Sequence, residues 1–182
     1  MKLSFSGAQA VGKSTLISEL VKLDEFSNFV TPESPTRFLY KKFGFDFSSA
    51  NVEIQLATLC MQQKNTYISG NNVILDRSVI DNFAYMLYHK EHNTFNYNSV
   101  VYEFILQESI SIAKDIDYIF YIHPEFPIVD DGVRSTDSVQ QKDIDTKIME
   151  AMGVLNIPKN KVFNITGSIK DRVDMVLNIV YP

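Results

Sequence analysis

The chain has 182 residues, of which 45% are hydrophobic, and it carries a formal net charge of −5. This length predicts a single domain spanning residues 1–182, and the acidic balance disfavours a nucleic-acid substrate, because proteins that bind nucleic acids usually present a basic face. The single cysteine excludes an internal disulfide framework, and no apolar run approaches the ~18 residues that cross a membrane, so we predict a cytoplasmic protein.

The first predicted element is an apolar strand at residues 2–6, which leads through the stretch GAQAVGKST at 7–15 into a helix at 13–23. The stretch fits the spacing G-x-x-x-x-G-K-[ST], in which glycines let backbone N–H groups converge on an anion at the start of a helix. The residues in register are Gly7, Gly12, Lys13 and Ser14. A glycine turn with a chance lysine is the alternative, but strand, loop and helix together predict a loop that binds the phosphates of ATP.

Three side chains of this loop have predicted roles in binding ATP. Lys13 supplies a positive charge to the β- and γ-phosphates, and the Ser14 hydroxyl is a suitable ligand for Mg²⁺. Thr15 follows at the start of the helix, and we assign it to the same group of ATP-binding residues.

A second strand is predicted at residues 28–31, and the polar stretch TPESPTRF follows it. Glu33 falls just past the strand end, where a carboxylate can take the proton of an acceptor hydroxyl. Arg37 lies four residues further on, within reach of an anion or of Glu33. The alternative for Glu33 is a carboxylate that caps the following helix.

A long helix is predicted at about 50–69, and the third strand, at 72–76, ends in the sequence LDRS. Asp76 at this strand end fits the carboxylate that holds Mg²⁺, directly or through water. Arg77 stands where a hydrolysing ATPase often has a glutamate that polarises water, and a cation is better suited to gripping phosphates. In the alternative, Asp76 only ends a strand and Arg77 is solvated.

On the long helix, Gln62 could read the edge of a base, but a solvated face is the favoured interpretation.

Helices at 79–89 and 98–114 lead to a fourth strand at 117–122. The stretch that follows, at about 124–138, is polar, rich in turn residues and too long for a simple connection, which is typical of a lid. Arg134 within it is predicted to close on the transferring phosphoryl group, because this transfer needs positive charge and positioning. The alternative is an ordinary surface cation.

The last predicted elements are a helix at 138–152, a strand at 161–165 and a helix at 169–180. Gly167 lies between the last two, where an adenine could lie against the backbone; a simple helix cap is the alternative. Strands that alternate with helices predict an α/β fold with a five-stranded parallel sheet and helices on both faces. Ligands of such sheets bind at the carboxyl ends of the strands, where these candidate residues fall.

In this order the motifs resemble those of P-loop kinases of nucleosides and nucleotides. GAQAVGKST, TPES and LDRS are similar to the pattern of thymidylate and deoxynucleoside kinases, and PIVDDGVRS, at 127–135, is similar to the lid segment of the ribosylnicotinamide kinase-like group. The resemblance implies a three-layer P-loop NTPase fold with a mobile lid, ATP and Mg²⁺ as cofactors, Glu33 as the base, and Arg77 and Arg134 as phosphate-binding residues. TPESPTRF matches neither the glycine-rich acceptor loop of thymidylate kinases nor the Glu-Pro of deoxynucleoside kinases, which leaves the acceptor unidentified.

The sequence therefore predicts an ATP-dependent kinase for a nucleoside or a nucleoside monophosphate, with Glu33, Arg37 and Arg77 at the acceptor. A homodimer is compatible with the chain. Two alternatives stay open: a kinase that acts on a modified base or end of DNA, which the acidic charge disfavours, and a nucleotide-binding switch that acts through a partner. The guanine-reading sequence N-K-x-D of GTPase switches is absent from the chain.

Overall fold

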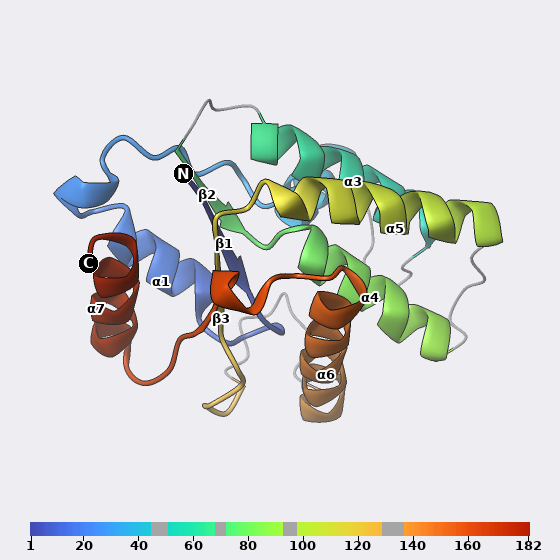
Figure 1. Ribbon diagram of the computed structural model, residues 1–182. Helices are drawn as coiled ribbons and strands as arrows, with labels where there is room; N and C mark the ends of the chain where they lie inside the picture. Colours follow the sequence, from blue (N-terminus) through green and yellow to red (C-terminus); the bar gives the residue numbers. More distant parts are fainter. Residues whose placement is uncertain (45–50, 68–71, 93–97, 129–136) are drawn as a thin grey trace.

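The computed structural model describes residues 1–44, 51–67, 72–92, 98–128 and 137–182. Within these ranges, four parallel strands form one sheet with the order β2-β1-β3-β4 (Figure 1). The strands are β1 (Lys2–Ser6), β2 (Val73–Asp76), β3 (Tyr118–Tyr121) and β4 (Val162–Asn164). Because all four run in the same direction, their carboxyl ends meet at one edge of the sheet.

The second predicted strand, at 28–31, is wrong: over the described residues the sheet has four strands instead of five. Val30 makes a single bridge to Val73, with backbone bonds of 3.0 and 2.9 Å to the residues on either side of it. The next bond of a parallel ladder would need the N–H of residue 32, which is a proline and has none. The chain therefore leaves the sheet after one bridge.

Helices cover both faces of the sheet, as predicted. They are α1 (Lys13–Leu20), α2 (Pro35–Phe43), α3 (Val52–Tyr67), α4 (Val79–Glu91), α5 (Ser99–Lys114), α6 (Ser138–Val154) and α7 (Ile169–Val180), with 3-10 turns at Asp24–Phe26 and Lys159–Lys161. In Figure 1, α1 and α7 lie side by side on one face, and α3 to α6 lie on the other. The sequence periodicity predicts each of these helices except α2. None of the helices in the described part of the chain is long and apolar enough to cross a membrane.

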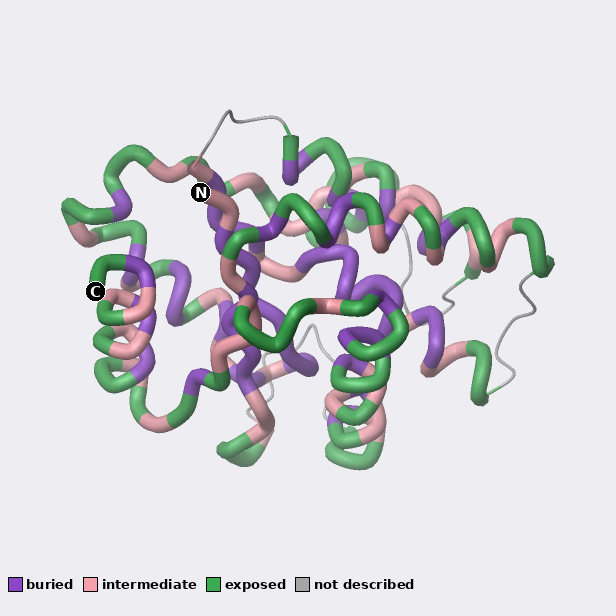
Figure 2. The backbone as a smooth tube through the Cα atoms, in the orientation of Figure 1, coloured by how far each residue is buried: buried purple, intermediate pink, exposed green. Residues whose placement is uncertain are grey.

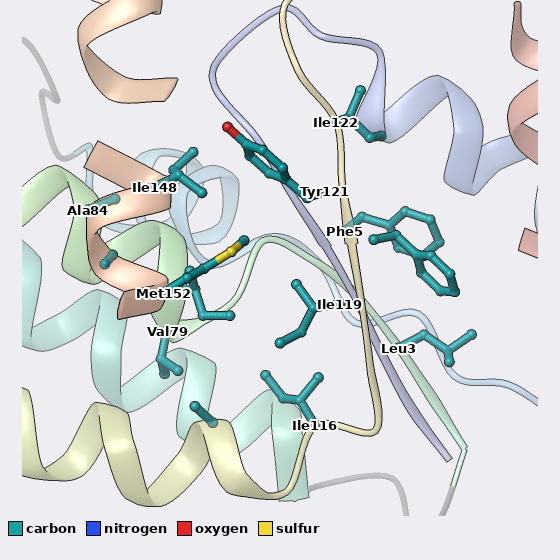
Figure 3. Close-up of a cluster of buried hydrophobic side chains, with 14 of the residues drawn as sticks. Leu3, Phe5, Val79, Ala84, Ile116, Ile119, Tyr121, Ile122, Ile148 and Met152 are labelled. Atoms are coloured by element: carbon teal, nitrogen blue, oxygen red, sulfur yellow. The ribbon is translucent and has the colours of Figure 1, made fainter. Parts of the chain in front are cut away.

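The core fills the space on both sides of the sheet, so that β1, β2 and β3 are mostly buried (Figure 2), whereas the edge strand β4 is partly exposed. In Figure 3, Leu3 and Phe5 of β1 point toward the side of α1, whereas Ile119 and Tyr121 of β3 lie on the side of α6, with Tyr121 beside Ile148. All five side chains are fully buried. Burial of a side chain of this size contributes about 1.5–3 kcal/mol. This packing fixes the strand ends from which the candidate site is built.

Candidate active site

The loop between β1 and α1 turns tightly at two glycines. Gly12 has a φ of 89°, in the left-handed region, and is the N-cap of α1. Gly7 has a φ of 155°, and a Cβ there would lie 2.5 Å from the carbonyl oxygen of Ile122, just past the end of β3. Side chains at these two positions would be strained, so the loop needs glycine at both. The close approach to Ile122 holds the loop against the carboxyl edge of the sheet.

Lys13 extends back over the loop to which it belongs. Its ammonium donates to the carbonyl oxygen of Gly7 at 2.8 Å and to that of Ala8 at 2.5 Å, and the residue is buried. Thr15 lies in the first turn of α1 and is exposed. The structure therefore places the predicted lysine charge inside the loop, at the start of a helix, where anions are favoured.

The two predicted Mg²⁺ ligands come together from separate elements. Ser14, at the start of α1, donates from its Oγ to Asp76 Oδ2 at 2.8 Å, at the end of β2. Arg37 Nη2, on α2, donates to the same Oγ at 3.0 Å. A hydroxyl and a carboxylate oxygen at this spacing fit a hard cation that is also held by phosphates and water, which is how Mg²⁺ usually binds beside nucleotides.

Arg77 lies beside the first glycine of the loop. Its Nη1 is 3.4 Å from both the carbonyl oxygen of Gly7 and Asp81 Oδ1, and the guanidinium lies over the ring of Tyr85 at 5.4 Å. Burial alone would lower the pKa of Arg77, but its neighbours Tyr85 and Asp81 raise it above its ordinary value. The positive φ of 74° at this residue aims the side chain toward the loop from the end of β2. Arg77 is thus a fixed cation next to Gly7.

Asp81 is a site residue that the sequence analysis missed. Its buried carboxylate accepts from Ser6 Oγ at 2.9 Å, from the Gly7 N–H at 3.2 Å and from the Ser78 N–H at 3.1 Å. The last bond belongs to a capping box at the start of α4. The sequence S-x-x-D at 78–81 is the local signal that could have found the box, but the bonds to β1 and Gly7 have no local signal. Asp81 therefore joins the phosphate loop to α4.

We expect Asp81→Asn to lower the free energy of unfolding by about 3 kcal/mol, because an amide nitrogen would face backbone N–H donors in a buried site. Urea unfolding of the variant measures this loss. Asp171→Asn is the matched control: Asp171 occupies the same position in the capping box of α7 but is exposed, so its loss should be much smaller. Equal losses in the two variants would show that Asp81 acts only as a helix cap.

Among the described residues, no hydrogen bond or ion pair joins Glu33 to the other predicted site residues. Its carboxylate is 42% exposed and pairs with Lys41 Nζ at 2.8 Å, on α2. The alternative of a helix cap is not supported, because the N-cap of α2 is Ser34 and no side-chain bond caps this helix. The backbone oxygen of Glu33 accepts from Asn65 Nδ2 at 3.1 Å, which ties this segment to α3. Its role as the base stays a prediction.

A narrow pocket lies between the Pro32 segment, α3 and the end of β2, and Asp76 and Arg77 form part of its lining; in this conformation it has no room for a molecule even of the size of water. The expectation of a solvated face at Gln62 is wrong: this residue lines the pocket and is only 4% exposed. Its Nε2 donates to the carbonyl oxygen of Ser78 at 2.6 Å, and its buried Oε1 has no hydrogen-bond partner among the described residues. α3 thus turns a polar face inward, which apolar periodicity cannot reveal.

Gly167, the residue predicted to lie beside the adenine, directly precedes the N-cap of α7. Gly167 has a φ of 85°, its N–H donates to Glu125 Oε2 at 2.9 Å, and its carbonyl oxygen accepts from Arg172 Nε at 2.9 Å. Of the predicted lid, residues 124–128 follow β3 without helix or strand, and α6 begins at Ser138. Arg134 lies outside the described residues.

Comparison with known proteins gives one family and a set of similar folds. The family model described as AAA domain matches residues 2–172. No curated protein matches the sequence.

Among solved structures, a NadR protein in complex with NAD and AMP-PNP superposes with a TM-score of 0.71 at 16% identity, covering 98% of this chain and 48% of that one. A NadR protein in complex with NR gives 0.73 at 18% identity, with 98% and 50% covered. The chain thus spans about half the length of these NadR proteins. Deoxyadenosine kinase from M. mycoides with bound dATP gives 0.68 at 15% identity and is covered over the full length of both chains. At such identities the likeness shows the fold.

Proposed function

Because the chain belongs to the AAA domain family AAA_28 and has the fold of P-loop nucleoside kinases, we propose that it transfers the γ-phosphoryl group of ATP to a nucleoside or a nucleoside monophosphate. The observation that carries the proposal is the convergence of Lys13, Ser14, Asp76 and Arg77 on one loop at the carboxyl edge of the sheet. A pocket lies directly beside these residues. This arrangement supports a phosphate site at the loop, with an acceptor that would bind beside it once the pocket opens.

In the proposed reaction the acceptor oxygen forms a bond to the γ-phosphorus while the bond from that phosphorus to the β–γ bridging oxygen breaks. ADP leaves with the electron pair of that bond. Lys13 and Arg77 neutralise the charge of the phosphates, and Arg134 is predicted to join them from the lid. Ser14 Oγ and the Asp76 carboxylate would hold Mg²⁺, which supplies further positive charge to the phosphates when bound.

The pocket lining favours a hydroxyl acceptor over a monophosphate. Gln62, Asn65 and Thr66 of α3 line the pocket with uncharged polar side chains, which would suit the hydroxyl, amide and ring nitrogen atoms of a nucleoside once they exchange their present backbone partners. A monophosphate would call instead for additional cations. Glu33 would take the proton of the attacking hydroxyl, and for this its carboxylate must exchange Lys41 for the acceptor.

ADP release across a panel of nucleosides, nucleoside monophosphates and ribosylnicotinamide tests the proposal, with ATP alone as the control. We expect one nucleoside-type compound to raise ADP release well above the rate with ATP alone, and its phosphorylated product to be found. ATP hydrolysis that no acceptor stimulates would favour the nucleotide switch. Stimulation by DNA ends alone, falling steeply with salt, would favour the DNA kinase. The mobile lid, the homodimer and the cytoplasmic location stay predictions.

A further inference from the structure

Arg172 is a buried arginine that lies against the phosphate loop but comes from the far end of the chain. It belongs to α7 and is 2% exposed. Its Nη1 donates to the carbonyl oxygen of Val11 at 2.7 Å, and a Cβ on Gly12 would lie 3.3 Å from the same nitrogen. The guanidinium therefore packs directly on the second half of the loop, next to Lys13.

The bond to Val11 fixes the direction of a loop N–H group. The peptide between Val11 and Gly12 is trans, so its carbonyl oxygen and its N–H point in opposite directions. Because Arg172 holds the carbonyl oxygen on the side of α7, the Gly12 N–H points away from α7. Phosphate loops work through N–H groups that are fixed before the anion arrives. Arg172 thus sets one of the groups that a triphosphate would accept from.

The same guanidinium holds a second loop. Its Nε donates to the carbonyl oxygen of Gly167 at 2.9 Å, and its Nη2 lies 3.3 Å from Glu125 Oε2. That carboxylate oxygen also accepts from the Gly167 N–H at 2.9 Å. Glu125 therefore binds the N–H of Gly167, and Arg172 binds its carbonyl oxygen. Through one side chain, the loop predicted to lie beside the adenine is joined to the loop predicted to hold the phosphates.

The chemistry of the site requires an arginine. A buried charge is tolerated only when it is paired and its donors are used, and here Glu125 supplies the opposite charge while two carbonyl oxygens take further donors. The planar guanidinium reaches three partners in different directions at once. A lysine at the same place keeps the charge but cannot reach all three.

We propose that Arg172 is a positioning residue for nucleotide binding, which holds the phosphate loop at Val11 and the loop at Gly167 in register, with Glu125 as its counter-charge. The inference rests on the proposed function in one respect, that the bound nucleotide is ATP. It predicts that loss of the three-partner contact of the Arg172 guanidinium weakens binding of the nucleotide and leaves binding of the acceptor unchanged.

The test compares Arg172→Lys with the wild-type chain by calorimetric titration with AMP-PNP and with inorganic tripolyphosphate. We expect the Kd of both to rise about tenfold in the variant, which corresponds to about 1.4 kcal/mol. Steady-state kinetics should show the same rise in KM for ATP and no more than a twofold change in KM for the acceptor. A Kd for AMP-PNP within twofold of the wild-type value would overturn the proposal.

The matched control is Val176→Ala, one turn further along α7 at a fully buried apolar position that cannot replace the hydrogen bonds of Arg172. It lowers Tm by opening a cavity, so it measures what general loosening of α7 does to binding. The proposal requires Val176→Ala to leave the Kd of AMP-PNP unchanged; an equal rise in both variants at equal loss of Tm would reduce Arg172 to a structural residue.

If Arg172→Lys does not fold, Glu125→Gln carries the test, because its side chain is 24% exposed and glutamine keeps an acceptor for the Gly167 N–H. We expect about a threefold weaker binding of AMP-PNP, and an unchanged Kd would contradict the role of Glu125 as counter-charge and with it the proposal.

A wild-type chain that binds AMP-PNP but phosphorylates no acceptor would refute the proposed kinase activity. The positioning role of Arg172 would then still be decided by the Kd values. A wild-type chain that binds neither ligand would refute both.

Discussion

Lys13→Ala is expected to abolish phosphoryl transfer, with a loss of about 10³-fold or more in kcat/KM. The lysine ammonium is the one side-chain charge that the structure places inside the phosphate loop among the described residues, bonded to the carbonyl oxygens of Gly7 and Ala8. Transfer of a phosphoryl group depends on positive charge at the phosphates far more than on covalent chemistry, so removal of this charge should affect the rate directly. ADP release with the best acceptor measures the effect.

The fold of this variant should stay intact, because the carbonyl oxygens of Gly7 and Ala8 that lose a donor tolerate this better than N–H groups do. Thermal unfolding checks the fold. Lys22→Ala is the control, since Lys22 is an exposed lysine just past the end of α1 that pairs only with Glu19 among the described residues. It should leave the rate unchanged. Near-wild-type turnover in Lys13→Ala would refute the phosphate-loop interpretation.

Glu33→Gln is expected to lower kcat by about 10²–10⁴-fold with a nucleoside acceptor, while the acceptor still binds. A hydroxyl must lose its proton during transfer, and a glutamine cannot take it. A monophosphate acceptor needs no base, because its attacking oxygen is already deprotonated near neutral pH. In that case the larger losses should follow substitution of Arg37, Arg77 or Arg134. Steady-state kinetics on the best acceptor separates the two classes.

Lys41→Met is the matched control for this experiment. It removes the ion pair that Glu33 makes in the structure but keeps the carboxylate, so the rate should persist if the carboxylate itself is the base. A comparable fall in kcat in both variants would mean that the Glu33–Lys41 ion pair acts by maintaining the conformation of this segment. If the best acceptor is a nucleoside and kcat of Glu33→Gln falls less than a few-fold, then Glu33 is not the base.

The phosphate site could be predicted from the sequence because its determinants are local. Gly7, Gly12, Lys13 and Ser14 follow one another in a fixed spacing between a strand and a helix, and a parallel sheet brings Asp76 to the same edge. The family match and the similar folds confirm the α/β architecture and the kinase-type fold inferred from these motifs. The residue roles themselves stay predictions.

The parts that could not be predicted depend on contacts between distant residues or on a single missing donor. Arg172 donates a hydrogen bond to Val11, which lies 161 positions away in the chain, and no local sequence pattern predicts such a contact. Gln62 is buried because its helix covers a polar pocket, where hydrophobic periodicity gives no signal. The predicted strand at 28–31 forms only one bridge, because a proline interrupts the hydrogen-bond ladder, and apolar content alone does not predict this.

The single bridge at Val30 leaves the segment around Glu33 outside the hydrogen-bond ladder of the sheet, held to the rest of the site by the side chains of Asn65 and Arg37. Insertions, deletions or substitutions in such a segment cost the sheet little, because loop length adds only slowly to the entropy of closure and no further ladder bonds are lost. The phosphate-binding half of the site depends on the core and on close backbone contacts, so it tolerates little change. The proposed kinase could therefore acquire a new acceptor by variation of this one segment, while the residues predicted to bind ATP stay unchanged.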